Sequence, residues 1–244
     1  MQIGPVLDID KQLALYREGR VRNRVYRIGV ELEGGWAELP SKTKVVRDGS
    51  IVFPEDQPYP NIVGELVGPP ISLGELSTWM NKFYPPFHNE TCGMHVHMSF
   101  KTAMTYQRLM TPEYPATIVS YMEKWSKENK LSKTNPIWER LAGNSRFCKH
   151  QFFADMQASV AAKDYDNNRQ GHRYTVINYC FSRHNTLECR LLPMMPDTTT
   201  AISAINEVIA ITNAFLLSSA KREEKYSLSI ENGEIEINKI RIEL

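Results

Sequence analysis

The chain has 244 residues, 42% of them hydrophobic, and a formal charge of +1 that results from 29 basic and 28 acidic residues. This apolar content is typical of a globular protein and excludes a chain that is disordered throughout. The balanced charge gives no electrostatic indication of a nucleic-acid or membrane surface, so partners have to be inferred from a site.

The N-terminal part of the chain predicts one helix and then strands. The spacing of apolar residues predicts a helix over residues 8–20. The alternating segment 26–33 predicts a strand that runs into a turn at Gly34–Gly35. Residues 44–53 resemble a hairpin whose turn is Asp48–Gly49.

The middle of the chain predicts two more strands, over residues 61–67 and 94–100, with a helix between them over residues 73–83. Pro85–Pro86 would stop that helix. A helical insertion is predicted over residues 101–170, interrupted near residues 130–136.

The C-terminal part predicts a strand pair, a long helix and an alternating tail. The strand pair covers residues 174–181 and 185–192, and the helix covers residues 200–220. The tail from residue 235 would form an edge strand. We interpret residues 1–244 as a single α+β domain around a mostly antiparallel sheet.

The four cysteines are far apart and form no C-x-x-C pair, which does not fit a disulfide framework. The first residues show no basic segment followed by an apolar one, and no stretch approaches the roughly 20 apolar residues of a membrane span. We therefore expect a cytoplasmic protein without a membrane partner.

Polar side chains recur at every second position of several predicted strands, and residues two apart in a strand share a face. The four sets are Glu31 with Glu33, Asp48 with Ser50, His95 with His97 and Ser99, and Glu188 with Arg190. The residues between them are mostly apolar, so the opposite face is expected to carry the helices. A single set such as Glu31 and Glu33 is equally well explained by solvent exposure, but four sets together favour a site.

Carboxylates and an imidazole on adjacent strands suit Mg²⁺ or Mn²⁺, because these cations prefer oxygen ligands and tolerate a histidine. Arg173 and Arg190 lie in the C-terminal strand pair, where their planar guanidinium groups could bind an anion. Cys92, His95 and His97 allow a zinc interpretation, although the second cysteine pair of a structural zinc site is missing.

Several of these segments are similar to the motifs of the amidoligase family, which shares the fold of glutamine synthetase and the carboxylate–amine ligases. The segments follow in the family's order between residues 29 and 192: Gly29-Val-Glu-Leu-Glu33, Val45-Val-Arg-Asp-Gly-Ser-Ile51, Gly64-Glu-Leu-Val-Gly-Pro-Pro70, Cys92-Gly-Met-His-Val-His-Met-Ser99, Arg173-Tyr-Thr-Val-Ile-Asn178 and Thr186-Leu-Glu-Cys-Arg190. Gly68 stands where the family usually has Ser. The resemblance implies a curved antiparallel sheet with helices on its convex face and a two-metal ATP site on its concave face.

The resemblance also implies a role for each matching residue. Metal ligands would be Glu31, His95 and Glu188 near the nucleotide phosphates, and Glu33 and Glu65 near the acceptor carboxylate. ATP contacts would come from His97 and Ser99, and phosphoryl contacts from Arg173 and Arg190. Asp48 would orient the amine or a metal-bound water, and Asp48 or Glu65 is the hypothetical general base.

The activity that the resemblance implies is ATP-dependent carboxylate–amine ligation through an acyl phosphate, with ATP and Mg²⁺ or Mn²⁺ as cofactors. The partners would be an amine and a carboxylate, which belongs to an amino acid, a peptide or a protein. A phosphotransferase, a metal-dependent hydrolase and a non-catalytic nucleotide-binding relative remain alternatives, and an oligomer remains possible.

Overall fold

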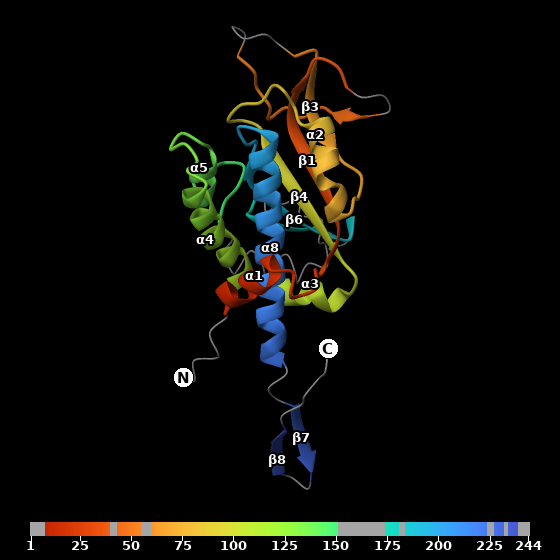
Figure 1. Ribbon diagram of the computed structural model, residues 1–244, viewed down its shortest axis with the longest axis vertical. Coiled ribbons are helices and arrows are strands. Elements are labelled where there is room, and N and C mark those ends of the chain that lie inside the picture. The colour runs from red at the N-terminus through yellow and green to blue at the C-terminus, as the bar shows by residue number, and fades with distance from the viewer. Residues whose placement is uncertain are drawn as a thin grey trace.

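The computed structural model describes residues 8–39, 43–54, 60–150, 174–180, 184–223, 227–231 and 234–238. Six antiparallel strands form a curled, half-barrel sheet packed against helices (Figure 1). The strands, in sheet order, are β2 (Val45–Val46), β3 (Ile62–Val67), β1 (Val25–Trp36), β4 (Gly93–Phe100), β6 (Thr186–Pro193) and β5 (Ile177–Cys180). This confirms the prediction of an α+β protein around an antiparallel sheet.

The helices are α1 (Ile9–Arg17), α2 (Leu76–Phe83), α3 (Ala103–Leu109), α4 (Glu113–Glu128), α5 (Ile137–Leu141) and α8 (Thr198–Glu223). The predicted interruption near residues 130–136 is confirmed, because α4 ends before it and α5 begins after it. Asp8 caps α1 by accepting a hydrogen bond from the Lys11 backbone N–H.

The long helix α8 lies across the sheet in Figure 1 and is the centre of the helical layer. Its Thr212 hydroxyl lies 3.6 Å from Met98 Sδ on the sheet and 2.8 Å from the Tyr114 hydroxyl of α4. The segment Thr198–Ser219 is long and apolar enough to cross a membrane by length and composition, so the expectation that no segment reaches this length is wrong. Most of that segment is buried inside the protein, as in the central helix of a globular core.

One face of the sheet is apolar and covered, as the alternation predicts. Val30, Leu32, Val96, Met98 and Leu187 are each at most 1% exposed. Burying these side chains against α8 and its neighbours contributes a large part of the hydrophobic stabilisation. The polar residues between them therefore lie on the other face.

The predicted turn at Gly34–Gly35 is wrong, because β1 continues through both glycines to Trp36. A Cβ atom on Gly34 would lie 2.6 Å from Pro85 Cβ, and one on Gly35 would lie 2.3 Å from Pro60 Cγ. The two glycines therefore allow neighbouring loops to pack closely against a strand.

The predicted hairpin over residues 44–53 forms only in part. Val45 and Val46 make the short strand β2, which pairs with β3, while residues 51–54 form no strand. The turn itself is present, since Asp48 Oδ1 accepts a hydrogen bond of 2.7 Å from the Ser50 backbone N–H.

The tail is not an edge strand of the main sheet. Instead, β8 (Glu234–Asn238) pairs with β7 (Ser227–Glu231) in a separate hairpin beyond the end of α8 (Figure 1). Arg173 and the end of the predicted helical insertion, residues 151–170, lie outside the described residues.

Candidate metal centre

Direct cross-strand pairing brings the predicted acidic and histidine residues together. The pairs are Glu33 with Glu65, Glu31 with His95, and His97 with Glu188. Paired positions in antiparallel strands have Cβ atoms about 4.5–5.5 Å apart, so their side chains interact. We call these six residues the acid stripe; it crosses β3, β1, β4 and β6.

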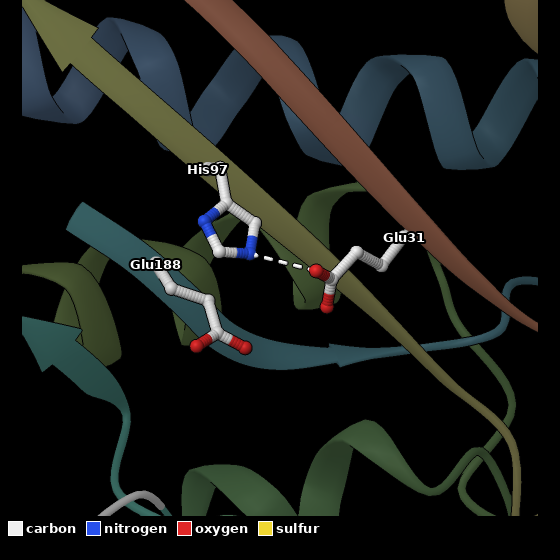
Figure 2. A group of neighbouring side chains, drawn as sticks. All are labelled: Glu31, His97 and Glu188. Carbon is white, nitrogen blue, oxygen red and sulfur yellow. Dashed lines mark ion pairs between the residues drawn. The ribbon is translucent and has the colours of Figure 1, made fainter. Parts of the chain in front are cut away.

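Glu31 lies at the centre of the acid stripe and contacts both histidines. Its Oε2 lies 3.1 Å from His95 Nδ1, and its Oε1 lies 3.1 Å from His97 Nε2. Figure 2 shows Glu31, His97 and Glu188 side by side, with Glu188 coming from the strand next to that of His97. Burial by itself would raise the pKa of Glu31, but His95 and His97 outweigh this effect and hold it well below its ordinary value.

Glu188 is a buried anion that several groups hold in place. Asn178 Nδ2 donates a 2.7 Å hydrogen bond to one of its carboxylate oxygens, and Arg190 Nη1 donates to the other. Burial disfavours the charged form of Glu188, but Arg190 and the two histidines outweigh it and lower its pKa. Arg190 also lies 3.4 Å from His95 Nδ1, which fixes the guanidinium group within the site.

Three groups of side chains, found among the described residues, have the composition and spacing to hold a cation. In each group, one possible ligand atom per residue lies within 4.8 Å of the other two. The groups are Glu31 with His97 and Glu188, Glu31 with Glu65 and His95, and Glu33 with Asp48 and Glu65. Two carboxylates, Glu31 and Glu65, each belong to two groups, so the donors form a continuous run.

This grouping differs in two respects from the predicted ligand sets. His97, which the sequence suggested as a nucleotide contact, joins Glu31 and Glu188. The predicted partner His95 also lies close to both, with its Nδ1 3.1 Å from Glu31 Oε2 and 3.4 Å from Glu188 Oε1. Asp48 joins the predicted pair Glu33 and Glu65.

The acid stripe carries more negative charge than its own residues neutralise. Burial and the nearby carboxylates of Glu31, Glu33 and Asp48 raise the pKa of Glu65 to about 9. His97 Nε2 is buried and, among the described residues, has no hydrogen-bond partner with suitable geometry, although Glu31 Oε1 lies 3.1 Å away. Like charges placed directly opposite each other are destabilising. Oxygen and imidazole donors with these properties fit Mg²⁺ or Mn²⁺.

A cavity of about 770 Å³ opens beside the acid stripe, within the size range of small-molecule sites. Glu31, His97 and Ser99 line it, together with the basic residues Arg27 and Lys101. The Ser99 hydroxyl donates a 3.2 Å hydrogen bond to the Arg27 carbonyl. We call this space the large cavity; at its polar end lie Glu31 and His97 of the acid stripe.

The zinc interpretation of the Cys92 segment finds no support in the geometry. Cys92 is fully buried and belongs to none of the donor groups formed by the described part of the chain. Burial raises the pKa of its thiol to about 11, which disfavours the thiolate that binds zinc. All four cysteines are buried and free of disulfide bonds.

Sequence reasoning assigned no role to three residues that support the site. Thr186 Oγ1 lies 2.9 Å from His97 Nδ1, and Asn178 donates to Glu188. The alternation could have found Thr186, which is two residues before Glu188, on the same strand. No sequence pattern indicated Arg140. In the fold this α5 residue is buried and donates hydrogen bonds to two β6 carbonyls, at 3.0 Å and 2.8 Å.

Comparison with known proteins gives no match: no protein-family model, no curated protein and no solved structure is similar to this chain at a significant level. The function is therefore inferred from the geometry and chemistry of the site.

Proposed function

We propose that this chain is an ATP-dependent carboxylate–amine ligase with a glutamine synthetase-like fold, two divalent cations along the acid stripe and Mg-ATP in the large cavity. The observation that carries this proposal is the sharing of Glu31 and Glu65 among three adjacent donor groups. Such sharing suits two neighbouring ions better than one. A nucleotide with bound Mg²⁺ is the ligand that most directly combines a cavity of this size with a carboxylate-rich end.

Each end of the acid stripe has its own ligand set. Glu31, His97 and Glu188 would hold the ion beside the large cavity, which Glu31 and His97 line. The ion at the other end would be held by Glu33, Asp48 and Glu65. When bound, such cations neutralise the triphosphate and the reacting carboxylate, which otherwise repel each other.

The proposed reaction has two steps. The substrate carboxylate attacks the γ-phosphorus of ATP, ADP leaves, and an acyl phosphate forms. An amine then attacks the acyl carbon, phosphate leaves, and the amine proton passes to a base. Asp48 and Glu65 are the candidates for this base, and the one that accepts the proton would be the one that does not coordinate the second ion at that step.

The positively charged side chains lie in two places around the site. Arg190 is fixed to Glu188 and lies next to His95, so it can stabilise negative charge that develops at the centre of the stripe. Arg27 and Lys101 line the large cavity and suit the outer phosphates or the ribose end of the nucleotide.

Mass spectrometry of reactions with Mg-ATP and panels of amines and carboxylates tests the proposal. We expect ADP release that requires both an amine and a carboxylate, and a product lighter by one water than the two substrates together. Glu31→Gln should abolish both signals, because Glu31 belongs to two donor groups. ADP release without an amine, or a phosphorylated product that accumulates as the end point, would instead identify a hydrolase or a phosphotransferase.

A further inference from the structure

A second cavity, of about 460 Å³, lies beside the turn that follows Asp48. Its lining residues are Gly49, Ser50, Val52, Arg146, Phe147 and Tyr174. None of them lines the large cavity. Gly49 and Ser50 directly follow Asp48, which belongs to the Glu33–Asp48–Glu65 donor group. We call this space the Arg146 cavity.

The Arg146 cavity also lies near Arg190 of β6. Tyr174, which forms part of its wall, has its ring centroid 5.7 Å from the guanidinium carbon of Arg190. Arg190 in turn binds Glu188. The cavity therefore neighbours the site at two points, through the residues that follow Asp48 and through Tyr174 beside Arg190.

Among the described residues that line this cavity, Arg146 is the one that is charged. Its guanidinium carbon lies 4.5 Å from the ring centroid of Phe147, an arrangement that holds the guanidinium group while its N–H edge stays available. Within the described ranges, Arg146 forms no ion pair with an acidic residue. An anion would find a planar, bidentate partner there.

The rest of the lining is suited to a flat or apolar body. Phe147 and Tyr174 are aromatic, and Val52 is an exposed aliphatic side chain at the cavity. A protonated amine substrate would be repelled by Arg146. A substrate with a single carboxylate could bind either the metal centre or Arg146, but not both. A substrate with two anionic groups can occupy both.

We infer that the Arg146 cavity is the acceptor site and that its substrate is a small carboxylate with a flat or apolar body and a second anionic group, which pairs with Arg146. The reacting carboxylate then faces Asp48 and the metal centre. This inference rests on the proposed function. The second group is a carboxylate or a phosphate, because the guanidinium group recognises both in the same way.

Calorimetric titration of the full chain in Mg²⁺ buffer, without ATP or amine, tests the inference. The probes are benzene-1,4-dicarboxylate, 4-phosphonobenzoate and benzoate. We expect at least one of the two doubly anionic probes to bind about tenfold more tightly than benzoate, and the tighter one identifies the second group. Arg146→Leu should remove this tenfold advantage, and Arg146→Lys should restore part of it.

Lys149→Leu is the matched control, because it removes an exposed positive charge three residues away that does not line the cavity. It should leave all three affinities unchanged. Equal binding of benzoate and the doubly anionic probes, no binding of any probe, or equal losses in the Arg146→Leu and Lys149→Leu proteins would overturn the inference. Binding through Arg146 without ligase activity would contradict only the proposed function, and ligase activity that is unchanged in Arg146→Leu would contradict only the inference.

Discussion

Glu65 and Glu33 lie directly opposite each other in β3 and β1, an arrangement that a protein without a bound cation tolerates by keeping a proton. The nearby carboxylates and burial together raise the pKa of Glu65 to about 9, from an ordinary value of 4.5. A bound divalent cation would replace this proton. The residue therefore couples metal binding to pH.

We expect the metal-free protein to lose stability as the pH rises from about 5 to about 9. Between these values the folded protein retains a proton on Glu65 that the unfolded chain releases. The stabilisation from Glu65 is therefore complete below the unfolded pKa and is lost as the pH rises through the folded pKa. Thermal melting in chelator-treated buffer over this range measures the effect.

Two comparisons test whether Glu65 causes this pH dependence. Glu65→Gln should flatten the curve, and excess Mg²⁺ should raise the melting temperature most at the alkaline end. A Glu65→Gln protein with the same pH dependence as the wild type would show that other groups are responsible.

Asn178 provides a test of how Glu188 is held. Because its amide donates to the Glu188 carboxylate from the neighbouring strand, Asn178→Ala should weaken Mn²⁺ binding by about 10- to 100-fold, as expected for a partner of a metal ligand. Asn81→Ala, on the exposed face of α2, should have no effect. Unchanged Mn²⁺ affinity in Asn178→Ala would argue against Glu188 as a ligand.

The faces of the strands could be predicted from the sequence, but their register could not. Alternation placed His95 and His97 on one face and Val96 and Met98 on the other. The contacts bear this out, because both histidines contact Glu31 while Met98 contacts Thr212 of α8. The pairing of His97 with Glu188 depends on strands that are far apart in the chain. No short turn fixes that register, so the sequence could not show that His97, as well as His95, lies close to Glu31 and Glu188.

The role of the glycines in the strands could not be predicted from the sequence, because it depends on neighbouring residues that only the fold brings into contact. Gly34–Gly35 has the composition of a turn, yet it lies within a strand, near its end, where Pro85 and Pro60 pack against it. Gly64, in β3, has a φ of +155°, and a Cβ atom there would lie 2.3 Å from the Val46 carbonyl oxygen.

Gly64→Ala should therefore destabilise the β2–β3 edge of the sheet and lower the free energy of unfolding by about 2 kcal/mol. For a chain of this length the melting temperature would fall by about 4–8 °C. Gly74→Ala is the matched control, because its Cβ atom would have no neighbour within 4 Å. Equal melting temperatures for the two variants would show that the strand adapts to the extra atom.

In the whole molecule, the two faces of one curled sheet have different roles: one forms the core and the other carries the candidate site. Its apolar face packs against α8 and supplies the core, which leaves the other face available for a run of charged residues. Sequence alternation predicted this division. The two cavities were not predictable, because their walls combine segments that only the complete fold brings together, such as Tyr26 with Asn185 and Ser50 with Arg146.

The number of divalent cations bound per chain is the most direct test of the metal centre. Titration with Mn²⁺, with the free ion followed by electron paramagnetic resonance, should show two ions bound per wild-type chain. Glu188 belongs to only one of the three donor groups, so Glu188→Gln should retain one ion, and Glu128→Gln, on the exposed surface of α4, should retain both. Absence of binding to the wild-type protein, or two ions still bound by Glu188→Gln, would contradict the account.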